Sequence, residues 1–353
     1  MPDIRIENLG KSFGGSKVLD GVSFTVRDKE FVTLLGPSGC GKTTTLMCIA
    51  GLLTPDEGLI ACGDETFTDR RAGIDQPAER RNLGLVFQSY ALWPHMTAAE
   101  NVAFPLRLRR AGKRAVRERV AEVLALVELK DHGTRYPHQL SGRQQQRVAL
   151  ARALAYSPRV LLLDEPFSNL DAKLRERARD RLKEVQHNLG LTTVFVTHDQ
   201  SEALSMSDRI LVMNAGRILR DGTPREVYRH PGTRFAAEFL GHCNFLTGVV
   251  AAGEGGATVL STPEFPGLVV QGRHEGPTAT IVVRPEDIEI AGSVHAGATG
   301  SVRGAVLDAA YLGDHYQYLV AVGAARVSVH SRRELASGPV WLRIPPGAAT
   351  FVD

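Results

Sequence analysis

The sequence is poor in cysteine, in aromatic residues and in excess charge of either sign. Its four cysteines among 353 residues are too scattered for a disulfide framework or a paired-thiol metal site. Aromatic residues make up only 6% and the formal net charge is +3, so the composition does not by itself indicate nucleic-acid binding. No apolar run approaches the roughly 18–20 residues that cross a bilayer, and the opening stretch MPDIRIENLGKSF does not resemble a signal peptide. We therefore expect a soluble protein of a reducing compartment, with any membrane role supplied through a partner.

What the sequence does contain changes in character near residue 240. Up to that point, strand-like apolar runs alternate with helical patterns, which predicts an α/β domain whose parallel strands are buried on both faces. The expected strands are 5–9, 30–36, 83–88, 159–165, 192–198 and 209–216, and the expected amphipathic helix is 114–129. From residue 241 onward, short β-type runs separated by turn residues predict a small all-β domain of the oligonucleotide/oligosaccharide-binding type.

Residues 36–43, GPSGCGKT, match a phosphate-loop motif in its proper context, after an apolar run and before a helix start. Glycines allow the backbone to approach a phosphate closely, and the loop and helix N–H groups can surround it. Lys42 would hold the β- and γ-phosphates, and the Thr43 hydroxyl suits Mg²⁺. The loop alone leaves GTPases, kinases and recombinases open. The residues predicted to bind nucleotide here are Gly36, Pro37, Ser38, Gly39, Cys40, Gly41, Lys42, Thr43 and Thr44.

Two further expected strands end in residues that suit phosphate chemistry. The run RVLLLDEP brings Asp164 and Glu165 to a carboxyl edge, where open α/β sheets bind ligands. Asp164 would hold Mg²⁺ through water and Glu165 would act as the general base toward the attacking water. Two acids capping a strand at a turn are the alternative. His198 ends TTVFVTH, and taken alone a histidine there is more often only a hydrogen-bonded surface residue.

The stretch LSGRQQQRVALARAL (140–154), followed by VLLLDEPFSNLD and VFVTHDQSEAL, resembles the nucleotide-binding subunit of an ATP-binding-cassette (ABC) transporter. LSGRQ is similar to the signature loop of that family, and no NKxD guanine-reading motif is visible. The resemblance covers about residues 4–240. It implies a P-loop ABC ATPase domain over 1–240, with a helical subdomain at about 89–158.

The tail also resembles part of such proteins. The segments VRPEDIEI (283–290) and YLGDHYQYLVAV (311–322) are similar to the β-rich, TOBE-type regulatory domain that follows the ATPase domain in importers. The resemblance implies a regulatory domain over 241–353, and a purely structural dimerisation domain is the alternative. No Cys/His cluster in this part suggests a metal site.

The resemblance assigns roles to individual residues of the ATP site. Phe13 stands where the family places an aromatic ring against adenine, and Val18 belongs to the same site. Gln88 corresponds to the glutamine that contacts Mg²⁺ and the attacking water and links the site to the membrane subunits. His198 corresponds to the residue that contacts the γ-phosphate and senses its loss. Together with Lys42 and Glu165, these two complete the expected catalytic set.

Other residues are expected to act on the nucleotide of a second subunit. Because Gly142 begins a helix, its N–H groups and the positive end of the helix dipole can face an anion. Arg143 departs from the family, which usually has glycine there, and it would be strained if the backbone needed a positive φ. We favour the benign alternative, in which the arginine points away or adds charge near the phosphates, because every surrounding residue fits the family. The signature residues that resemble those closing on the opposite γ-phosphate are Ser141, Gly142 and Gln144. The loop expected to cross the dimer interface comprises Ser168, Asn169, Leu170 and Asp171.

The implied function is ATP hydrolysis, with Mg²⁺, that energises solute import. The resemblance implies an ATP-closed homodimer beneath two transmembrane permease subunits, peripheral on the cytoplasmic face of the inner membrane and served indirectly by a solute-binding protein. The wording of the motifs is most similar to ferric-iron and polyamine importers, and sugar, phosphonate and oxyanion importers are alternatives. A soluble cassette ATPase of DNA repair or translation is the competing class, but the chain has neither a second cassette nor a long coiled-coil insertion. Intact Glu165 and His198 argue against a regulator that binds ATP without turnover.

Two segments of the expected helical subdomain are candidates for contacts outside the ATP site. The basic segment Arg107–Arg119 is interpreted first as a solvated helix face, with anionic lipid as an alternative. Because no aromatic platform accompanies it, nucleic acid is not an expected partner. The segment 89–97, SYALWPHMT, is predicted to form the groove for a coupling helix of the permease, although Tyr90 and Trp93 could equally be packing residues.

Overall fold

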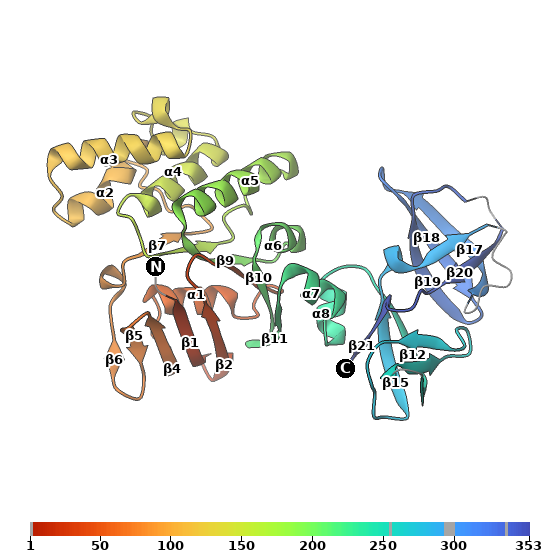
Figure 1. Cartoon of the computed structure of the whole chain (residues 1–353). Helices are drawn as coiled ribbons and strands as arrows, with labels where there is room; N and C mark the ends of the chain where they lie inside the picture. Colours follow the sequence, from red (N-terminus) through yellow and green to blue (C-terminus); the bar gives the residue numbers. More distant parts are fainter. Residues whose placement is uncertain (1–2, 254–255, 293–300, 336–337) are drawn as a thin grey trace. The chain divides into compact units, whose positions relative to one another are not determined.

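The computed structural model describes residues 3–253, 256–292, 301–335 and 338–353. The chain packs into two compact units, Met1–Pro224 and Arg225–Asp353 (Figure 1). Helix α8 (Arg234–Phe239) thus falls in the second unit, whereas the change in composition comes just after it. The domain boundary at 240/241 stays a prediction. Within the described ranges, no helix combines the length and the apolar character needed to cross a membrane.

The first unit is built on a mostly parallel sheet with strand order β11-β10-β3-β9-β8-β7. Neighbouring strands from β10 to β7 are parallel, and β11 adds antiparallel to β10 at one edge. Every residue of β3, β8 and β9 is buried, as expected for strands covered on both faces. The predicted α/β class is confirmed. The strands are β3 Phe31–Leu35, β7 Leu83–Val86, β8 Val160–Asp164, β9 Thr192–Thr197, β10 Arg209–Asn214 and β11 Arg217–Gly222.

An antiparallel sheet with order β2-β1-β4-β5-β6 completes the strands of this unit. Of these strands only β1 was expected from the sequence, at 5–9. The others mix polar residues with bulges at which the pairing shifts register, and this hides the strand pattern. Helix α1 (Lys42–Ala50) shares one hydrophobic core with both sheets. The strands are β1 Ile4–Phe13, β2 Ser16–Val26, β4 Glu57–Cys62, β5 Glu65–Asp69 and β6 Ile74–Asp75.

Side chains that alternate along each parallel strand define the two faces of the parallel sheet. In β8, Val160 and Leu162 join the core around α1, whereas Leu161 and Leu163 join the core beneath α5. Helices α2, α3 and α4 enclose a further apolar cluster (Figure 1). The helix expected at 114–129 is confirmed as α3. The remaining helices of the unit are α2 Ala98–Leu108, α3 Lys113–Leu126, α4 Gly142–Leu154, α5 Ala172–Leu189 and α6 Gln200–Met206, and short 3₁₀ turns lie at Ala78–Arg80, Lys130–His132 and Pro137–Gln139. Helix α7 (Pro224–Arg229) begins at the last residue of this unit and otherwise belongs to the second.

The sheets of the second unit confirm the predicted all-β region. Their strand orders are β14-β13-β12-β15-β21 and β16-β20-β17-β18-β19, and side chains from both sheets form one core. A 3₁₀ turn lies at Pro285–Asp287. The strands are β12 Asn244–Ala252, β13 Thr258–Ser261, β14 Leu268–Val270, β15 Thr278–Val283, β16 Glu289–Ala291, β17 Ser301–Tyr311, β18 Tyr316–Val322, β19 Ala325–Ser331, β20 Pro339–Arg343 and β21 Ala349–Val352.

Candidate functional site

The phosphate loop and three of the predicted site residues lie at the ends of four neighbouring parallel strands. The loop 36–41 follows β3, His198 follows β9, Asp164 ends β8, and Gln88 lies just beyond β7. These strands are adjacent in the order β3-β9-β8-β7, so their carboxyl ends share one edge of the sheet. That edge is where open α/β sheets place ligands.

Glycine is required sterically at two positions of the loop. A Cβ on Gly36 would lie 2.3 Å from the carbonyl oxygen of Met213 and 2.7 Å from Sγ of Cys40. Gly41 has φ +104°, in the left-handed region that favours glycine, and a Cβ there would lie 2.7 Å from Cδ2 of Leu19. The loop therefore keeps its backbone bare where β3 turns into α1.

Lys42 holds its positive charge over this loop. Its Nζ donates hydrogen bonds to the carbonyl oxygens of Gly36 (2.7 Å) and Pro37 (2.9 Å), and the side chain is almost fully buried. Lys42 is also the first residue of α1, so the positive end of the helix dipole and the unpaired N–H groups lie beside the ammonium group. Burial raises the pKa of the neighbouring Cys40 thiol. The arrangement suits a polyanion such as a nucleotide phosphate chain.

Two oxygen ligands lie next to the lysine. Thr43 Oγ1 donates a 2.8 Å hydrogen bond to Oδ1 of Asp164 at the end of β8. Burial raises the pKa of Asp164, which the hydrogen bond from Thr43 partly offsets. A hydroxyl and a carboxylate are hard ligands of the kind that Mg²⁺ prefers. No group of three or more His, Cys, Asp or Glu side chains suited to a metal gathers in the part of the chain that the structure describes.

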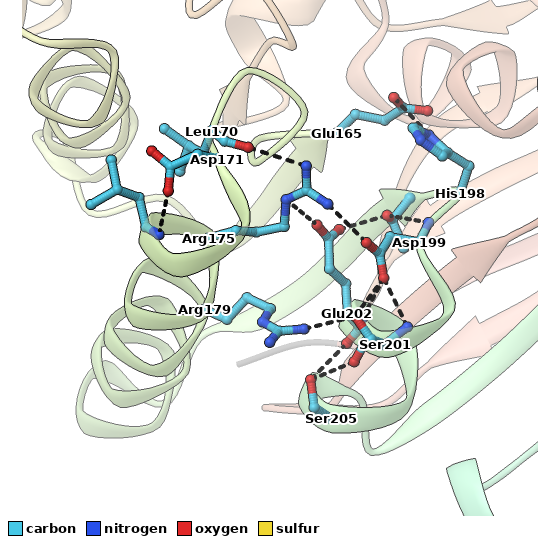
Figure 2. Close-up of polar contacts among 12 residues, drawn as sticks. Glu165, Leu170, Asp171, Arg175, Arg179, His198, Asp199, Ser201, Glu202 and Ser205 are labelled. Atoms are coloured by element: carbon cyan, nitrogen blue, oxygen red, sulfur yellow. Dashed lines mark hydrogen bonds and ion pairs between the residues drawn. The ribbon is translucent and has the colours of Figure 1, made fainter. Parts of the chain in front are cut away.

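Glu165 contacts two of the other residues predicted to be catalytic, His198 and Gln88. Its Oε2 lies 3.1 Å from Nδ1 of His198 and accepts a 3.3 Å hydrogen bond from Nε2 of Gln88. Figure 2 shows Glu165 and His198 facing one another from the ends of adjacent strands. The backbone of Glu165 has φ +42°, a strained conformation of the kind that gathers at functional sites, and its N–H is held by the carbonyl of Val196 at 3.0 Å. The structure thus brings the three side chains together, and their catalytic roles stay predictions.

The segment that carries Gln88 is fixed by two residues from elsewhere in the fold. Asn169, from the predicted interface loop, donates to the carbonyl of Gln88 at 3.1 Å. Arg152 of α4 donates to the carbonyls of Tyr90 and Ala91 at 2.8 and 2.5 Å. Both of those residues have positive φ, which turns their carbonyls toward the arginine. The role of Arg152 was not predicted, because in the sequence it is one of several arginines in a helical segment and nothing marks its carbonyl partners.

The predicted signature residues begin α4 and do not reach the phosphate loop of the same chain. Ser141 caps the helix, its Oγ accepting from the Gln144 N–H while the Gln144 side chain accepts from the Ser141 N–H. Arg143 lies within the helix and is not among the described residues with positive φ, so the strain considered for it does not arise. Ser141 and Gly142 are exposed, and within the described ranges no hydrogen bond or ion pair links 141–144 to residues 36–43.

Two predicted ATP-binding residues lie on the antiparallel sheet. The Val18 carbonyl would be only 2.9 Å from a Cβ on Gly41, so β2 lies directly against the phosphate loop. Phe13 ends β1 with its ring 48% exposed, and Nζ of Lys11 lies 5.5 Å from the ring centroid. An exposed ring can stack on a base, and the adenine-stacking role of Phe13 stays a prediction.

A groove of about 610 Å³ lies between the end of the sheet and α2 and α4. Trp93 lines it with 44% of its surface exposed and packs at 5.6 Å, centroid to centroid, against Phe104. Leu108 and Tyr156 belong to the same lining. Tyr90, in contrast, is buried in the core beneath α5 and is a packing residue. The aromatic segment 89–97 therefore divides between core and groove.

The basic segment Arg107–Arg119 is mostly exposed, in line with a solvated helix face. Arg119 is the exception. It donates to the carbonyls of Ala155 and Leu154 at 2.9 and 3.0 Å, which satisfies the open end of α4. Part of this positive charge is therefore committed to holding α3 against α4.

Comparison with known proteins decides the family. Residues 19–168 match the ABC transporter family and residues 281–352 match the TOBE domain. The chain is 48% identical to the spermidine/putrescine import ATP-binding protein PotA of Marinobacter nauticus, over 81% of this chain and 76% of that protein. It is 46% identical to the Fe(3+) ions import ATP-binding protein FbpC of Rhizobium etli, over 90% of this chain and 87% of that protein. The chain belongs to the ABC transporter ATP-binding proteins.

Solved ABC structures agree with this assignment. A dimeric ATP-binding cassette, MJ0796, in a post-hydrolysis state bound to ADP and Pi matches with a TM-score of 0.55 and 35% identity, covering 63% of this chain and 99% of that chain. A second dimeric structure of the same cassette matches with a TM-score of 0.56 and 36% identity, over the same shares. The predicted family, the P-loop ATPase fold and the TOBE-type tail are therefore confirmed. This chain is an ATPase coupled to transport.

Proposed function

We propose that this ABC ATPase hydrolyses Mg-ATP to energise the import of ferric iron or a polyamine. The observation that carries the proposal is the meeting of Glu165 with His198 and Gln88 beside the phosphate loop. A carboxylate held by two polar side chains at the carboxyl edge of a P-loop sheet is suited to accept a proton from an attacking water. The choice of solutes is supported by relatives named for spermidine/putrescine and for Fe(3+) import.

The chemistry follows from the positions of the side chains. Lys42 and the loop amides stabilise charge on the β- and γ-phosphates, and Glu165 accepts the proton of the attacking water. His198 and Gln88 keep the carboxylate and the water in line. Bound Mg²⁺ supplies neutralising charge, and Thr43 and Asp164, already 2.8 Å apart, are the residues that would hold it together with Gln88 and the phosphates. Catalysis of this kind is mostly positioning and electrostatics.

A second copy of the chain completes the site in this proposal. In the part of the chain that the structure describes, no hydrogen bond or ion pair links the exposed Ser141 and Gly142 to their own phosphate loop, so they are available to the nucleotide of a partner copy. The match to two dimeric cassettes supports an ATP-closed homodimer. In this proposal the groove at Trp93 receives a permease helix, and the homodimer works at the cytoplasmic face of the membrane beneath two permease subunits.

The identity of the solute is tested on the assembled transporter. The ATPase would be co-purified with its permease subunits and reconstituted into vesicles with the solute-binding protein. We expect ferric iron or a polyamine to stimulate ATP hydrolysis through the binding protein. Stimulation by a sugar, a phosphonate or an oxyanion instead would contradict the proposed solute and leave the ATPase assignment intact.

The substitution Glu165→Gln tests the hydrolytic mechanism. The amide keeps the shape of the side chain but cannot accept a proton, so the rate of ATP hydrolysis should fall by roughly 100-fold or more. ATP should then hold the variant as a dimer in size-exclusion chromatography. Glu176→Gln, an exposed carboxylate on α5, is the matched control and should retain the rate of the parent. A monomeric Glu165→Gln protein with an unchanged ATPase rate would disprove the mechanism.

A further inference from the structure

Arg175, on the first turns of α5, contacts two functional segments at once. Its Nη2 donates to the carbonyl oxygen of Leu170 at 3.1 Å, and its Nη1 donates to Oδ2 of Asp199 at 3.0 Å. Leu170 belongs to the predicted interface loop 168–171, and Asp199 directly follows His198. Figure 2 shows the guanidinium between these two segments. None of the residue roles predicted from the sequence includes this arginine.

Asp199 is held rigidly on its other side. Its Oδ1 accepts the N–H groups of Ser201 and Glu202 at 2.8 and 3.1 Å, which caps α6. Burial by itself would raise the pKa of Asp199. The hydrogen bonds from Ser201 and Glu202, together with the charge of Arg175, outweigh burial and lower the pKa. The carboxylate therefore stays charged. Because it binds both Arg175 and the backbone N–H groups that follow His198, a movement of Arg175 would move that backbone as well.

Glu202 extends the same network to the residue before the histidine. Its side chain is 3% exposed, and its Oε2 accepts a 2.6 Å hydrogen bond from Thr197 Oγ1. Thr197 Oγ1 in turn accepts the N–H of Asp199 at 3.0 Å. Nε of Arg175 lies 3.7 Å from Oε1 of Glu202, so one guanidinium faces two carboxylates. Both chain neighbours of His198 are thereby tied to Arg175.

We propose that Arg175 is a positioning residue that couples the interface loop 168–171 to the switch histidine, His198. The inference rests on the proposed ATP-closed homodimer, in which that loop meets the second copy. When the loop moves on closure, the Leu170 carbonyl and the Asp199 carboxylate must move together because they share one planar guanidinium. A fork with donors at fixed angles couples two acceptors, and a lysine ammonium lacks that geometry.

The chain offers a matched control for this role. Arg179 lies one turn further along α5 and also contacts α6, through a 3.0 Å hydrogen bond to Ser201 Oγ. Among the described residues it makes no hydrogen bond or ion pair with Leu170, Asp199 or Glu202, although its charge opposes in part the rise that burial causes in the pKa of Glu202. Figure 2 shows its hydrogen bond to Ser201. Arg179→Lys therefore reproduces the loss of a guanidinium between α5 and α6 without touching the interface loop.

The test compares Arg175→Lys and Arg179→Lys in the full-length chain and in the Glu165→Gln background. We expect Arg175→Lys to lower kcat about tenfold and to raise the dissociation constant of the ATP-bound Glu165→Gln dimer by a similar factor. The affinity of the monomer for ADP should change by less than about twofold, because Arg175 contacts no residue of the phosphate loop within the described chain. Arg179→Lys should leave all three quantities at the level of the parent.

Several outcomes would overturn the coupling role. These are an Arg175→Lys protein with parental kcat and dimer affinity, an equal loss of ADP affinity, or an equal effect of Arg179→Lys. Melting temperatures of the lysine variants separate a coupling defect from unfolding, and Asp199→Asn, which weakens the same contact from the other side, should reproduce the dimer defect. A Glu165→Gln protein that stays monomeric with ATP would overturn the proposed function and the coupling with it. A dimeric Glu165→Gln protein that is indifferent to Arg175→Lys would overturn the coupling alone.

Discussion

In the phosphate loop, the absence of a side chain at the glycines matters as much as the charged side chain of Lys42. Gly36 and Gly41 have no space for a side chain, and this lets β2, β3 and α1 converge on the loop. Lys42 and Glu165 then present opposite charges along the sheet edge without pairing to each other, since each is held by other groups. The chemistry of the site thus depends on two positions that only glycine can occupy, Gly36 and Gly41, and on one non-glycine residue with a strained backbone, Glu165.

The substitution Gly41→Ala tests this dependence. The new Cβ would meet Cδ2 of Leu19 at 2.7 Å on a backbone with φ +104°, so the loop must shift away from β2. We expect the KM for ATP to rise about tenfold or more, since strain of this kind typically costs about 1–3 kcal/mol. Gly112→Ala, at a position with open space and ordinary φ, should leave the kinetics unchanged. Parental KM in Gly41→Ala would show that the loop does not need its left-handed residue.

At the scale of secondary-structure elements, helix α1 is fixed at both ends by different means. Its beginning lies in the phosphate loop, and its last carbonyls are satisfied by Arg81, which is completely buried. The Arg81 Nη1 donates to the carbonyls of Cys48 and Ile49 at 2.8 and 3.0 Å, and its Nε donates to the carbonyl of Gln76 at 2.7 Å. A helix end inside the protein needs such partners because water cannot reach it.

Arg81→Ala should therefore be strongly destabilising. It removes the side-chain donors of the Cys48, Ile49 and Gln76 carbonyls, of which Cys48 keeps the Gly51 N–H, and it opens a cavity, so we expect the free energy of unfolding of the first unit to fall by about 3 kcal/mol or more. Denaturant titration followed by circular dichroism measures the change. The exposed neighbour Arg80, changed to alanine, should shift stability by less than about 0.5 kcal/mol. Equal stability of the two variants would refute the structural role of Arg81.

At the scale of the whole molecule, each compact unit has a hydrophobic core of its own. In the second unit, His330 on β19 lies with its ring 4.4 Å, centroid to centroid, from that of His315. Burial and then the charge of His315 lower the pKa of His330, and Glu286, 3.9 Å away, opposes them only in part. The folded second unit therefore binds a proton at His330 less readily than the unfolded chain does.

This difference makes the stability of the second unit depend on pH. A folded pKa below the ordinary value of about 6.5 means that the contribution of His330 is complete above that value and is lost as pH falls below it. We expect the second unit to melt at a lower temperature at pH 5 than at pH 7.5, and the decrease to shrink in His330→Gln. Of the two tryptophans, Trp341 lies in this unit, so its fluorescence in a Trp93→Phe background reports the transition.

His274→Gln is the control for this pH dependence. His274 is exposed in the same unit, so its substitution removes a histidine while the half-buried His330 stays in place. The variant should keep the decrease in melting temperature seen in the Trp93→Phe background. A decrease of the same size in His330→Gln would refute the assignment to His330.

Much of the first unit could be predicted because its strands and motifs are local. Buried parallel strands leave continuous apolar runs, as in 159–165 and 192–198, and the motifs follow at their ends. The antiparallel strands β2 and β4 were not predicted, because partial exposure and shifts of register remove the alternation that identifies a strand. The contacts of Arg152 with Tyr90 and Ala91, and that of Arg175 with Leu170, were likewise invisible, since their acceptors are backbone carbonyls, which any residue carries.

Spacing along the chain was enough to identify the family, the order of the motifs and the residue types that phosphate chemistry needs. Which of these residues meet depended on the fold. It joined Glu165 to His198 and Gln88, placed Ser141 away from its own phosphate loop, and put Arg175 between the interface loop and the histidine. The physical reason is that strand order in the sheet, and not position in the chain, sets which carboxyl ends are neighbours.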